Sequence, residues 1–320
     1  MSVTKTEWFF IVNPRAGSGK TMSKWVPVEQ KMQKLGIPFV TVMTDHKKHA
    51  IALSEEAANE GYRKIIAVGG DGSAHEILNG ICRWCDSTGT PTEEFTIGVI
   101  PIGSGNDWVK SLGISHDYDK IVSLIGQECT GTTDVVKVSV GDGSAKYMLN
   151  IGGTGFDSQV CDRVNIQKES GMRSSMIYLN SLIYTIFHIS AKQFKVIADG
   201  ETRYEGECYS IALGNGKYSG GGMRQVPNAD LDDGILDYMI VPKMPLSRIF
   251  RQIPRLFSGN IDKSDDVISG NCRSLQIVPL DAESADIIEL DGEIEGRLPL
   301  SIEMVERKIN VLKASADTEA

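Results

Sequence analysis

The sequence of 320 residues contains no long apolar run and no excess of basic charge. Its longest apolar segment, residues 176–189, is interrupted by polar side chains and falls short of the roughly 20 residues that cross a bilayer. We therefore expect this segment to form a largely buried helix. The chain has 33 lysines and arginines against 42 aspartates and glutamates, a formal net charge of −9. This balance argues against a nucleic-acid-binding protein, and any membrane contact has to be local and partly apolar.

The six cysteines are scattered along the chain, and only Cys82 and Cys85 form a C-x-x-C pair. No second pair supplies the other two ligands of a zinc site, so this pair is read as two ordinary helix residues. The first seven residues are polar, and the apolar run at residues 8–12 is too short for the apolar part of a secretory signal peptide. We therefore expect a cytoplasmic protein with reduced thiols.

The first 130 residues alternate strand-like runs with helical patterns. The strand-like runs cover residues 8–12, 39–43, 64–68 and 96–100, and the helical patterns lie around 25–35, 48–60, 74–85 and 106–112. Such a βαβα series predicts a mainly parallel sheet covered on both faces, with ligands at the carboxyl ends of its strands. Three loops that carry glycine follow these strands and are expected to meet at one edge: residues 14–20, 69–73 and 101–107.

A different pattern follows residue 130, where apolar residues recur at every second position between turn signals. Runs at 134–140 and 146–151 flank one predicted turn, and runs at 194–198 and 207–213 flank a second. Further strand-like runs cover residues 235–241, 274–278, 285–290 and 300–305. The pattern predicts a second, mainly antiparallel β domain.

The first glycine loop, IVNPRAGSGKT at residues 11–21, differs from a Walker A loop at one position. Pro14 stands where that motif has its first glycine, and proline has no backbone N–H to offer a phosphate. The loop is therefore not a P-loop. Free backbone N–H groups in the residues after Arg15 still suit a phosphate site of another kind.

The second and third loops each lead from a strand directly into a helix. In GGDGS, residues 69–73, the glycines let backbone N–H groups approach a phosphate, and the helix N-terminus favours an anion. Asp71 would then lie where Mg²⁺ is wanted, although a turn or a helix cap is the alternative role. In the third loop Ser104 is placed to touch phosphate or ribose, while Asp107 opens a helix and by itself would be a capping residue.

In combination the three loops resemble the diacylglycerol kinase catalytic-domain family, in particular the soluble bacterial lipid kinases, whose pattern runs NPxxG, GGDG[TS] and PxG[TS]xND. Later signatures of the family lie at residues 150–157, 214–216, 227–234 and 291–293, so the resemblance covers essentially the whole chain. It implies an α/β plus β fold: an ATP-binding α/β domain at residues 1–130, like those of NAD kinases and phosphofructokinases, and a β-sandwich domain at 131–299. The C-terminal segment, about residues 300–320, would pack back on the first domain.

The resemblance also implies the roles of individual residues. It places Mg²⁺ on Asp71 and Asp107 and makes Glu293 the general base. A structural Mg²⁺ would bind to the Asp233 carboxylate and to the main-chain carbonyls of Asp230 and Ile235, for which an acidic turn is the alternative. The residues implied to contact ATP are Asn13, Pro14, Arg15, Ala16, Gly17, Thr44, Gly69, Gly70, Asp71, Gly72, Ser73, Ala74, His75 and Ser104.

The expected function is an ATP- and Mg²⁺-dependent lipid kinase that phosphorylates the hydroxyl of diacylglycerol or a related lipid. An NAD kinase or sugar-phosphate kinase of the same fold, and a nucleotide-binding regulator without catalysis, stay open as alternatives. We expect a cytoplasmic enzyme that is peripheral to the membrane during turnover. The oligomeric state stays open, with a homodimer as one candidate. Residues 245–257 could make that membrane contact or form the solvated face of a packed helix, because three arginines share one side and apolar residues the other: Arg248, Arg251, Arg255, and Ile249, Phe250, Ile253, Phe257.

Overall fold

The computed structural model describes residues 4–103, 105–141, 143–169, 176–304 and 306–314. The chain forms two compact units, Met1–Val135 with Arg307–Ala320, and Val136–Glu306. The chain returns to the first unit at residue 307, whereas the expected position was about residue 300. The reason is strand pairing, because β18 (Leu300–Glu303) pairs with strands of the second unit, whereas β19 (Lys308–Leu312) pairs with strands of the first.

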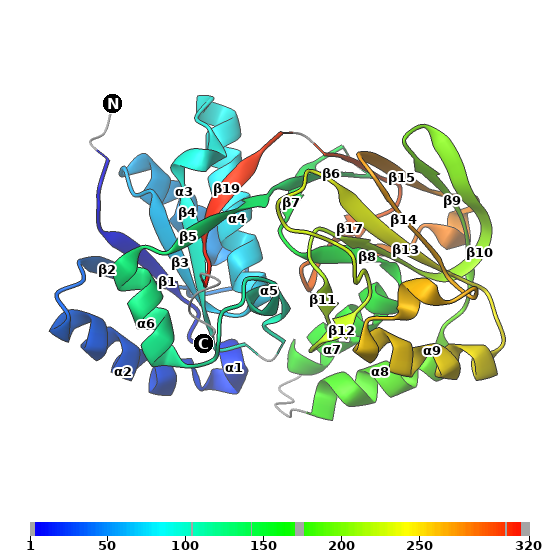
Figure 1. Ribbon diagram of the computed structural model, residues 1–320, viewed down its shortest axis with the longest axis horizontal. Coiled ribbons are helices and arrows are strands. Elements are labelled where there is room, and N and C mark those ends of the chain that lie inside the picture. Colours follow the sequence, from blue (N-terminus) through cyan, green and yellow to red (C-terminus); the bar gives the residue numbers. More distant parts are fainter. Residues whose placement is uncertain (1–3, 104, 142, 170–175, 305, 315–320) are drawn as a thin grey trace. The chain divides into compact units, whose positions relative to one another are not determined.

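The first unit is a six-stranded sheet with helices on both faces (Figure 1). Its strand order is β2-β1-β3-β4-β19-β5, with every pairing parallel except that of β5 with β19. The strands are β1 (Trp8–Val12), β2 (Phe39–Met43), β3 (Lys64–Gly69), β4 (Thr96–Pro101) and β5 (Thr130–Asp134). The apolar run of β1 is buried at all five positions, as expected of a parallel strand that is covered on both faces.

The helices of the first unit connect these strands. They are α1 (Ala16–Gly19), α2 (Thr21–Lys34), α3 (His49–Asn59), α4 (Asp71–Thr88), α5 (Asp107–Ser111) and α6 (Tyr118–Gln127), and the short η1 (Thr92–Glu94) precedes β4. The sequence patterns predicted four of the six α-helices and missed the four-residue α1 and α6. Helix α6 begins at a capping residue, since the Asp117 carboxylate accepts the N–H groups of Asp119 and Lys120.

The second unit is a β sandwich of antiparallel strands. Its hydrogen-bonded path runs β17-β16-β8-β10-β9-β15-β18-β6-β7, and β13 joins β10 to β14. Both predicted hairpins are present, as the pairs β6–β7 and β9–β10. The strands are β6 (Val136–Val140), β7 (Ala145–Met148), β8 (Ile151–Gly155), β9 (Lys192–Ala198), β10 (Glu201–Gly214), β13 (Leu236–Pro242), β14 (Ile268–Cys272), β15 (Ser274–Pro279), β16 (Ile287–Leu290) and β17 (Glu293–Arg297).

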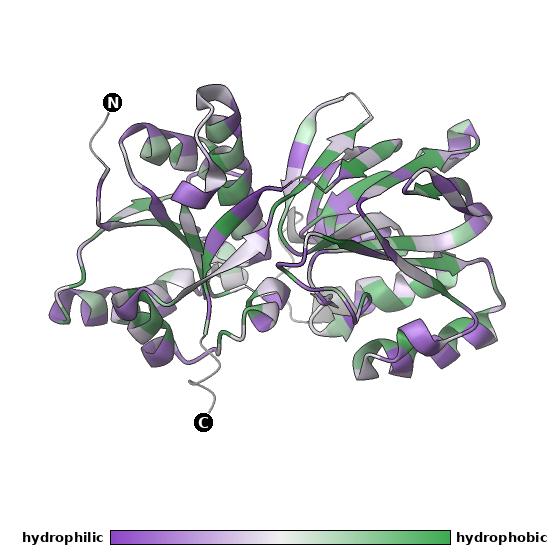
Figure 2. Ribbon diagram, turned by 45° about the horizontal axis from the view of Figure 1, so that its top comes forward, coloured by the Kyte–Doolittle hydropathy of each residue, from purple (hydrophilic) through white to green (hydrophobic). Residues whose placement is uncertain are grey.

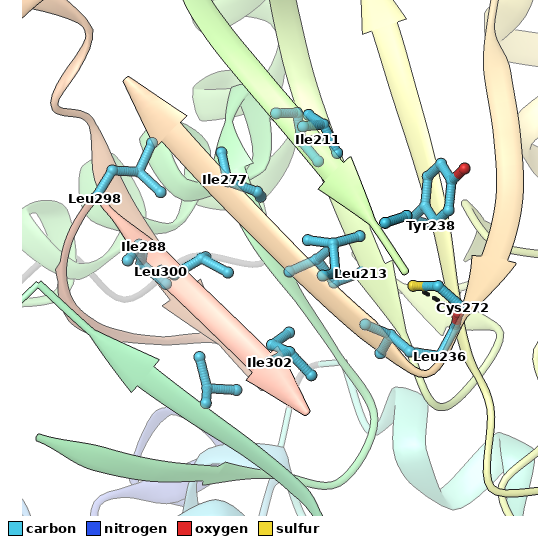
Figure 3. Close-up of a cluster of buried hydrophobic side chains, with 14 of the residues drawn as sticks. Ile211, Leu213, Leu236, Tyr238, Cys272, Ile277, Ile288, Leu298, Leu300 and Ile302 are labelled. Atoms are coloured by element: carbon cyan, nitrogen blue, oxygen red, sulfur yellow. Dashed lines mark hydrogen bonds between the residues drawn. The ribbon is translucent and has the colours of Figure 1, made fainter. Parts of the chain in front are cut away.

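The sandwich core comes from the alternation that the sequence shows. In β6, Val136, Val138 and Val140 are buried while the two residues between them are partly exposed. Figure 3 shows side chains of β10, β13, β15, β16 and β18 pointing toward one another in this core. The remaining elements of the unit are α7 (Phe156–Glu169), α8 (Met176–His188), α9 (Leu246–Ser258), β11 (Tyr218–Ser219), β12 (Met223–Arg224), η2 (Ile261–Lys263) and η3 (Ala282–Ser284).

Helix α8 corrects one expectation, because in its described second half it is not largely buried. Ser181 and Thr185 are 0% and 5% exposed, whereas Ile183 and Phe187 are 46% and 59% exposed. Two of the polar residues that interrupt the apolar run, Ser181 and Thr185, thus lie with Ile186 on the buried side of the helix, and the Ser181 hydroxyl donates to the side-chain amide oxygen of Gln167 at 3.3 Å. Within the described ranges, no helix is both long enough and apolar enough to cross a membrane.

Candidate active site

Three loops meet at the carboxyl edge of the sheet in the first unit. The Gly69 carbonyl accepts hydrogen bonds from the N–H groups of Ile102 (2.7 Å) and Gly103 (3.0 Å), which joins the loop after β3 to the loop after β4. The Asn13 N–H donates to the Val68 carbonyl (3.0 Å) and joins the loop after β1 to β3. Most of the predicted ATP-contacting residues lie at this edge, in the loops, directly after β2, at the end of β3 and in the first turns of α1 and α4: Asn13, Pro14, Arg15, Ala16, Gly17, Thr44, Gly69, Gly70, Asp71, Gly72 and Ser73.

The backbone of the loop after β1 takes a conformation that favours glycine. Gly17, Ser18 and Gly19 all have positive φ angles, of 55°, 59° and 80°. A Cβ at Gly17 would lie 2.4 Å from the Ile102 carbonyl oxygen, so the loop after β4 leaves no room for a side chain there. The Asn13 side-chain oxygen accepts the Arg15 N–H at 3.0 Å and fixes the start of the turn.

The loops after β3 and β4 touch through glycine backbone. A Cβ at Gly103 would lie 2.7 Å from the Gly70 Cα and 2.8 Å from the Asn106 side-chain oxygen. Gly70 is also the N-cap of α4, so this contact lies at the N-terminus of an 18-residue helix. Backbone N–H groups and the helix dipole make such a position favourable for a phosphate.

Replacing Gly103 by alanine is expected to destabilise the protein by about 1–3 kcal/mol, because the methyl group overlaps the Gly70 backbone and forces the two loops apart. The KM for the nucleotide should rise at the same time, since the resemblance places the nucleotide phosphates on these loops. Gly89→Ala is the matched control for helix α4, because no atom lies within 4 Å of its Cβ position, although its own φ of 72° makes it strained. Unchanged nucleotide binding in folded Gly103→Ala would remove this contact from the site.

Asp71 joins two helices, a role that sequence patterns do not show. Its carboxylate oxygens accept the N–H groups of Asp107 (3.0 Å) and Trp108 (3.2 Å) at the start of α5. Asp107 is 5% exposed, and its carboxylate pairs with Lys110 at 2.7 Å. Asp71 is therefore a helix cap as well as a candidate ligand.

The two carboxylates nevertheless face one point at the edge of the sheet. A Cβ at Gly105 would lie 3.2 Å from an Asp107 oxygen and 3.4 Å from an Asp71 oxygen. Among the described residues, no group of three or more His, Cys, Asp and Glu side chains could hold a metal ion. Mg²⁺ in kinases is commonly held by one or two carboxylates plus substrate phosphates, so this pair of carboxylates fits the ion that the resemblance implies.

Asn106 contributes an acceptor beside the contact of Gly70 with Gly103, because its side-chain oxygen would lie 2.8 Å from a Cβ at Gly103. It has a left-handed φ of 52°, and its side-chain amide donates to the Gly103 carbonyl at 2.9 Å. Its side-chain oxygen is buried, and no donor in the described part of the chain reaches it. A buried acceptor without a partner costs free energy, and a donor from a bound ligand would satisfy it.

Other predicted residues lie further from the loop edge. The His75 side chain is 2% exposed, and its ring nitrogen lies 3.3 Å from the Asn79 amide one helical turn away. Ala74 is also buried in α4, and Ser104 lies outside the described residues. Glu76 was not predicted, yet its carboxylate accepts the N–H groups of Lys48 (3.0 Å) and Ala50 (3.1 Å) at the start of α3.

In the second unit, Glu293 begins β17 directly after a two-residue hairpin turn. Asp291 and Gly292 have φ angles of 52° and 86°, the conformation of a type I′ turn, and Leu290 pairs with Glu293 across it. The Gly292 N–H donates to the Glu289 carboxylate. Glu293 is half-buried. The Glu293 carboxylate is therefore carried on a fixed backbone.

Asp291 fixes this turn to the neighbouring strand. Asp291 is only 4% exposed. Its carboxylate accepts hydrogen bonds from three backbone N–H groups, those of Leu149 (2.9 Å), Asn150 (2.8 Å) and Ile151 (3.2 Å). Three hydrogen bonds to one buried carboxylate make it a strong anchor. Sequence reasoning treated Asp291 as a turn residue and missed this role.

The loop predicted to hold a structural cation is an acidic turn in the structure. The Asp230 and Asp233 carboxylates accept the N–H groups of Asp232 (3.2 Å) and Ile235 (3.0 Å). Burial, reinforced by the negative charge of Asp233, raises the pKa of Asp237 to about 6. A cation beside these carboxylates would relieve their repulsion, so the oxygen-rich turn fits a hard ion such as Mg²⁺.

Comparisons with known proteins agree with both units. The model of the diacylglycerol kinase catalytic domain matches residues 7–138, and that of the YegS C-terminal NAD kinase beta sandwich-like domain matches residues 151–313. A diacylglycerol kinase of Mycobacterium tuberculosis is 25% identical over 305 residues, which cover 95% of this chain and 94% of the relative. One of Staphylococcus aureus is 27% identical over 302 residues, 94% of this chain and 90% of the relative.

A solved structure agrees with this fold. A crystal structure of a diacylglycerol kinase from Bacillus anthracis superposes with a TM-score of 0.70 at 23% identity and covers 97% of both chains. The predicted α/β plus β-sandwich fold is confirmed. Since the two family models together span nearly the whole chain, it belongs to the diacylglycerol kinase catalytic-domain family and is a lipid kinase.

Proposed function

We propose that this lipid kinase transfers the γ-phosphate of ATP, with Mg²⁺, to the free hydroxyl of diacylglycerol or a closely related lipid. The observation that carries the proposal is the pair of Asp71 and Asp107 carboxylates at Gly105, beside the glycine contact at the N-terminus of α4. A nucleoside triphosphate needs N–H donors for its phosphates and carboxylates for its metal ion, and this edge of the sheet supplies both.

The residues divide the work of phosphoryl transfer. The loops after β1, β3 and β4 bind and orient the triphosphate, because their backbones approach one another too closely for side chains. Asp71 and Asp107 would hold Mg²⁺, which neutralises charge on the phosphates. Glu293 would accept the proton of the attacking lipid hydroxyl. The names of the relatives favour diacylglycerol as the acceptor.

The test is transfer of labelled γ-phosphate from ATP, with Mg²⁺, to lipids in mixed micelles. The acceptors are diacylglycerol, phosphatidylglycerol, ceramide, a sphingoid base and a polyprenol, with NAD as a soluble control. We expect label on diacylglycerol, none after chelation of Mg²⁺, and none with the double variant Asp71→Asn/Asp107→Asn. Label on NAD alone, or binding of ATP without transfer to any lipid, would contradict the proposal.

A further inference from the structure

Exposed apolar side chains concentrate on two neighbouring helices of the second unit. Among the large hydrophobic side chains that are exposed in the described chain, the majority lie on α8 and α9, and they include every exposed aromatic one. We call this set the α8–α9 ridge: Ile183 (46% exposed), Tyr184 (43%), Phe187 (59%), Leu246 (43%), Phe250 (44%) and Phe257 (57%). Scattered exposed apolar residues are normal, but a contiguous group marks an interaction surface.

The ridge is continuous across the two helices. The rings of Phe187 in α8 and Phe250 in α9 have their centroids 5.9 Å apart. On α8 the exposed residues are spaced one and three apart, and on α9 they are spaced four and seven apart, so each set lies on one side of its helix. The two sides meet at the phenylalanine pair.

Helix α9 is attached to the unit by other residues. The Gln252 side chain is buried and donates to the Asp266 carboxylate at 2.7 Å, and Leu256 packs against a buried cluster that includes Val267. The helix continues through Pro254. Phe250 and Phe257 are therefore not needed to hold α9 in place.

A basic side of α9 lies next to its exposed apolar side, and Figure 2 shows hydrophilic and hydrophobic residues alternating along this helix. Arg248 pairs with Asp266 at 3.1 Å. Arg251 and Arg255 are exposed and have no ion pair with any described residue. With Gln252 and the neighbouring acidic residues, they line a cavity of about 440 Å³.

These charges indicate what covers the ridge. A second copy that docked through the same surface would bring its own Arg251 and Arg255 toward these two arginines, and like charges repel. Anionic lipid headgroups complement arginines, and an apolar edge beside them suits the boundary between headgroups and acyl chains. The acceptor of a lipid kinase also resides in a bilayer, and in this respect the inference rests on the proposed function.

We propose that the α8–α9 ridge docks the enzyme on a bilayer that contains anionic lipid. The aromatic side chains of the ridge enter the acyl boundary, and Arg251 and Arg255 bind headgroup phosphates. Docking of this kind depends on two contributions, apolar burial and local positive charge. Each contribution can be removed by its own variant.

Co-sedimentation with vesicles tests the proposal. Vesicles of phosphatidylcholine alone are compared with vesicles that contain phosphatidylglycerol as well. Phe187→Ser/Phe250→Ser is expected to lower the partition coefficient for the mixed vesicles about tenfold. Leu35→Ser/Leu280→Ser is its control, because these apolar side chains are exposed elsewhere, at 60% and 42%. Wild-type binding by the ridge variant would overturn the proposal.

The arginines are tested in the same assay. Arg251→Glu/Arg255→Glu should lose binding to the mixed vesicles, and high salt should weaken wild-type binding in the same way. Lys24→Glu/Lys34→Glu makes the same change in net charge at two exposed positions of α2 and should bind as the wild type does. Equal losses in both charge variants would assign the effect to overall charge and contradict a local site.

Two further measurements separate this proposal from its alternatives. If light scattering shows a wild-type dimer, a monomeric Phe187→Ser/Phe250→Ser variant and equal vesicle binding, the ridge is a contact between copies of the chain and the proposal is wrong. Activity on a short-chain diacylglycerol dissolved as monomers should be equal in the wild type and the ridge variant, and activity on lipid in vesicles should fall. No transfer to either substrate by the wild type would instead contradict the proposed function.

Discussion

Replacing Glu293 by glutamine is expected to lower kcat about 10²–10⁴-fold and to leave the fold intact. An amide cannot accept the proton of the lipid hydroxyl, and general base catalysis contributes a factor of this size, roughly 3–5 kcal/mol in the barrier. The backbone of the turn is held by Asp291 and Glu289, so a glutamine of equal size should occupy the same place. The measurement is kcat with the lipid acceptor, together with a thermal unfolding curve for each protein.

Two comparisons make this result specific. The KM for ATP should change little, because the nucleotide loops belong to the first unit and Glu293 to the second. Glu303→Gln removes the same charge from an exposed position in β18 and should turn over as the wild type does. A folded Glu293→Gln enzyme with normal kcat would exclude Glu293 as the base.

The edge of the sheet that carries the candidate site was predictable because its signals are local. Four parallel strands appear in the sequence as short apolar runs, and the loops after the three buried ones, β1, β3 and β4, carry glycines. Once the strands are parallel and adjacent, their carboxyl ends meet without further information. The combination of three loops was specific enough to indicate the family, which the comparisons confirm.

The side-chain anchors were not predictable from the sequence, because each joins residues that are distant along the chain. Asp71 caps a helix 36 residues later, Glu76 caps one that begins earlier, and Asp291 binds N–H groups 142 residues away. A motif reports that an aspartate is present in a turn, but only tertiary structure shows which backbone groups lie opposite. The pattern therefore predicted a metal ligand at Asp71, with a turn or a helix cap as the alternative, and did not show that the helix it caps is α5.

Strand β19 and helix α8 show two further limits of pattern reading. The strand is only five residues long, and its place in the first unit depends on pairing with β4 and β5. In α8, the polar residues looked like interruptions of a buried run, but Ser181 and Thr185 are four residues apart and lie with Ile186 on its buried side. Apolar content alone does not say which side of a helix faces solvent.

Replacing Asp291 by alanine is expected to reduce stability by about 3–5 kcal/mol. The change leaves the N–H groups of Leu149, Asn150 and Ile151 buried without their acceptor, and each such loss costs about 1–3 kcal/mol before relaxation. Alanine is also disfavoured at the φ of 52° that the turn requires. Asp291→Asn tolerates this φ and keeps one acceptor oxygen, so it should lose about 1–3 kcal/mol.

The chain offers a matched control for this anchor in Asp199. It also lies in a hairpin turn with a φ of 51°, and its carboxylate accepts the N–H groups of Arg273 and Ser274, both at 2.9 Å. Asp199 is exposed, so water replaces the lost acceptor when it is changed to alanine. The two variants carry similar turn strain, and they differ in the burial of the carboxylate and in the number of N–H groups that lose it, three for Asp291 and two for Asp199.

Thermal unfolding followed by far-UV circular dichroism measures the difference. The Asp291→Ala midpoint should fall about 10 °C below that of the wild type, and the Asp199→Ala midpoint should fall much less. All four tryptophans, at positions 8, 25, 84 and 108, belong to the first unit, so tryptophan fluorescence follows that unit separately. Equal midpoints for the two alanine variants would mean that the loss of stability comes from turn strain. The buried carboxylate of Asp291 would then not be what anchors the hairpin that carries Glu293.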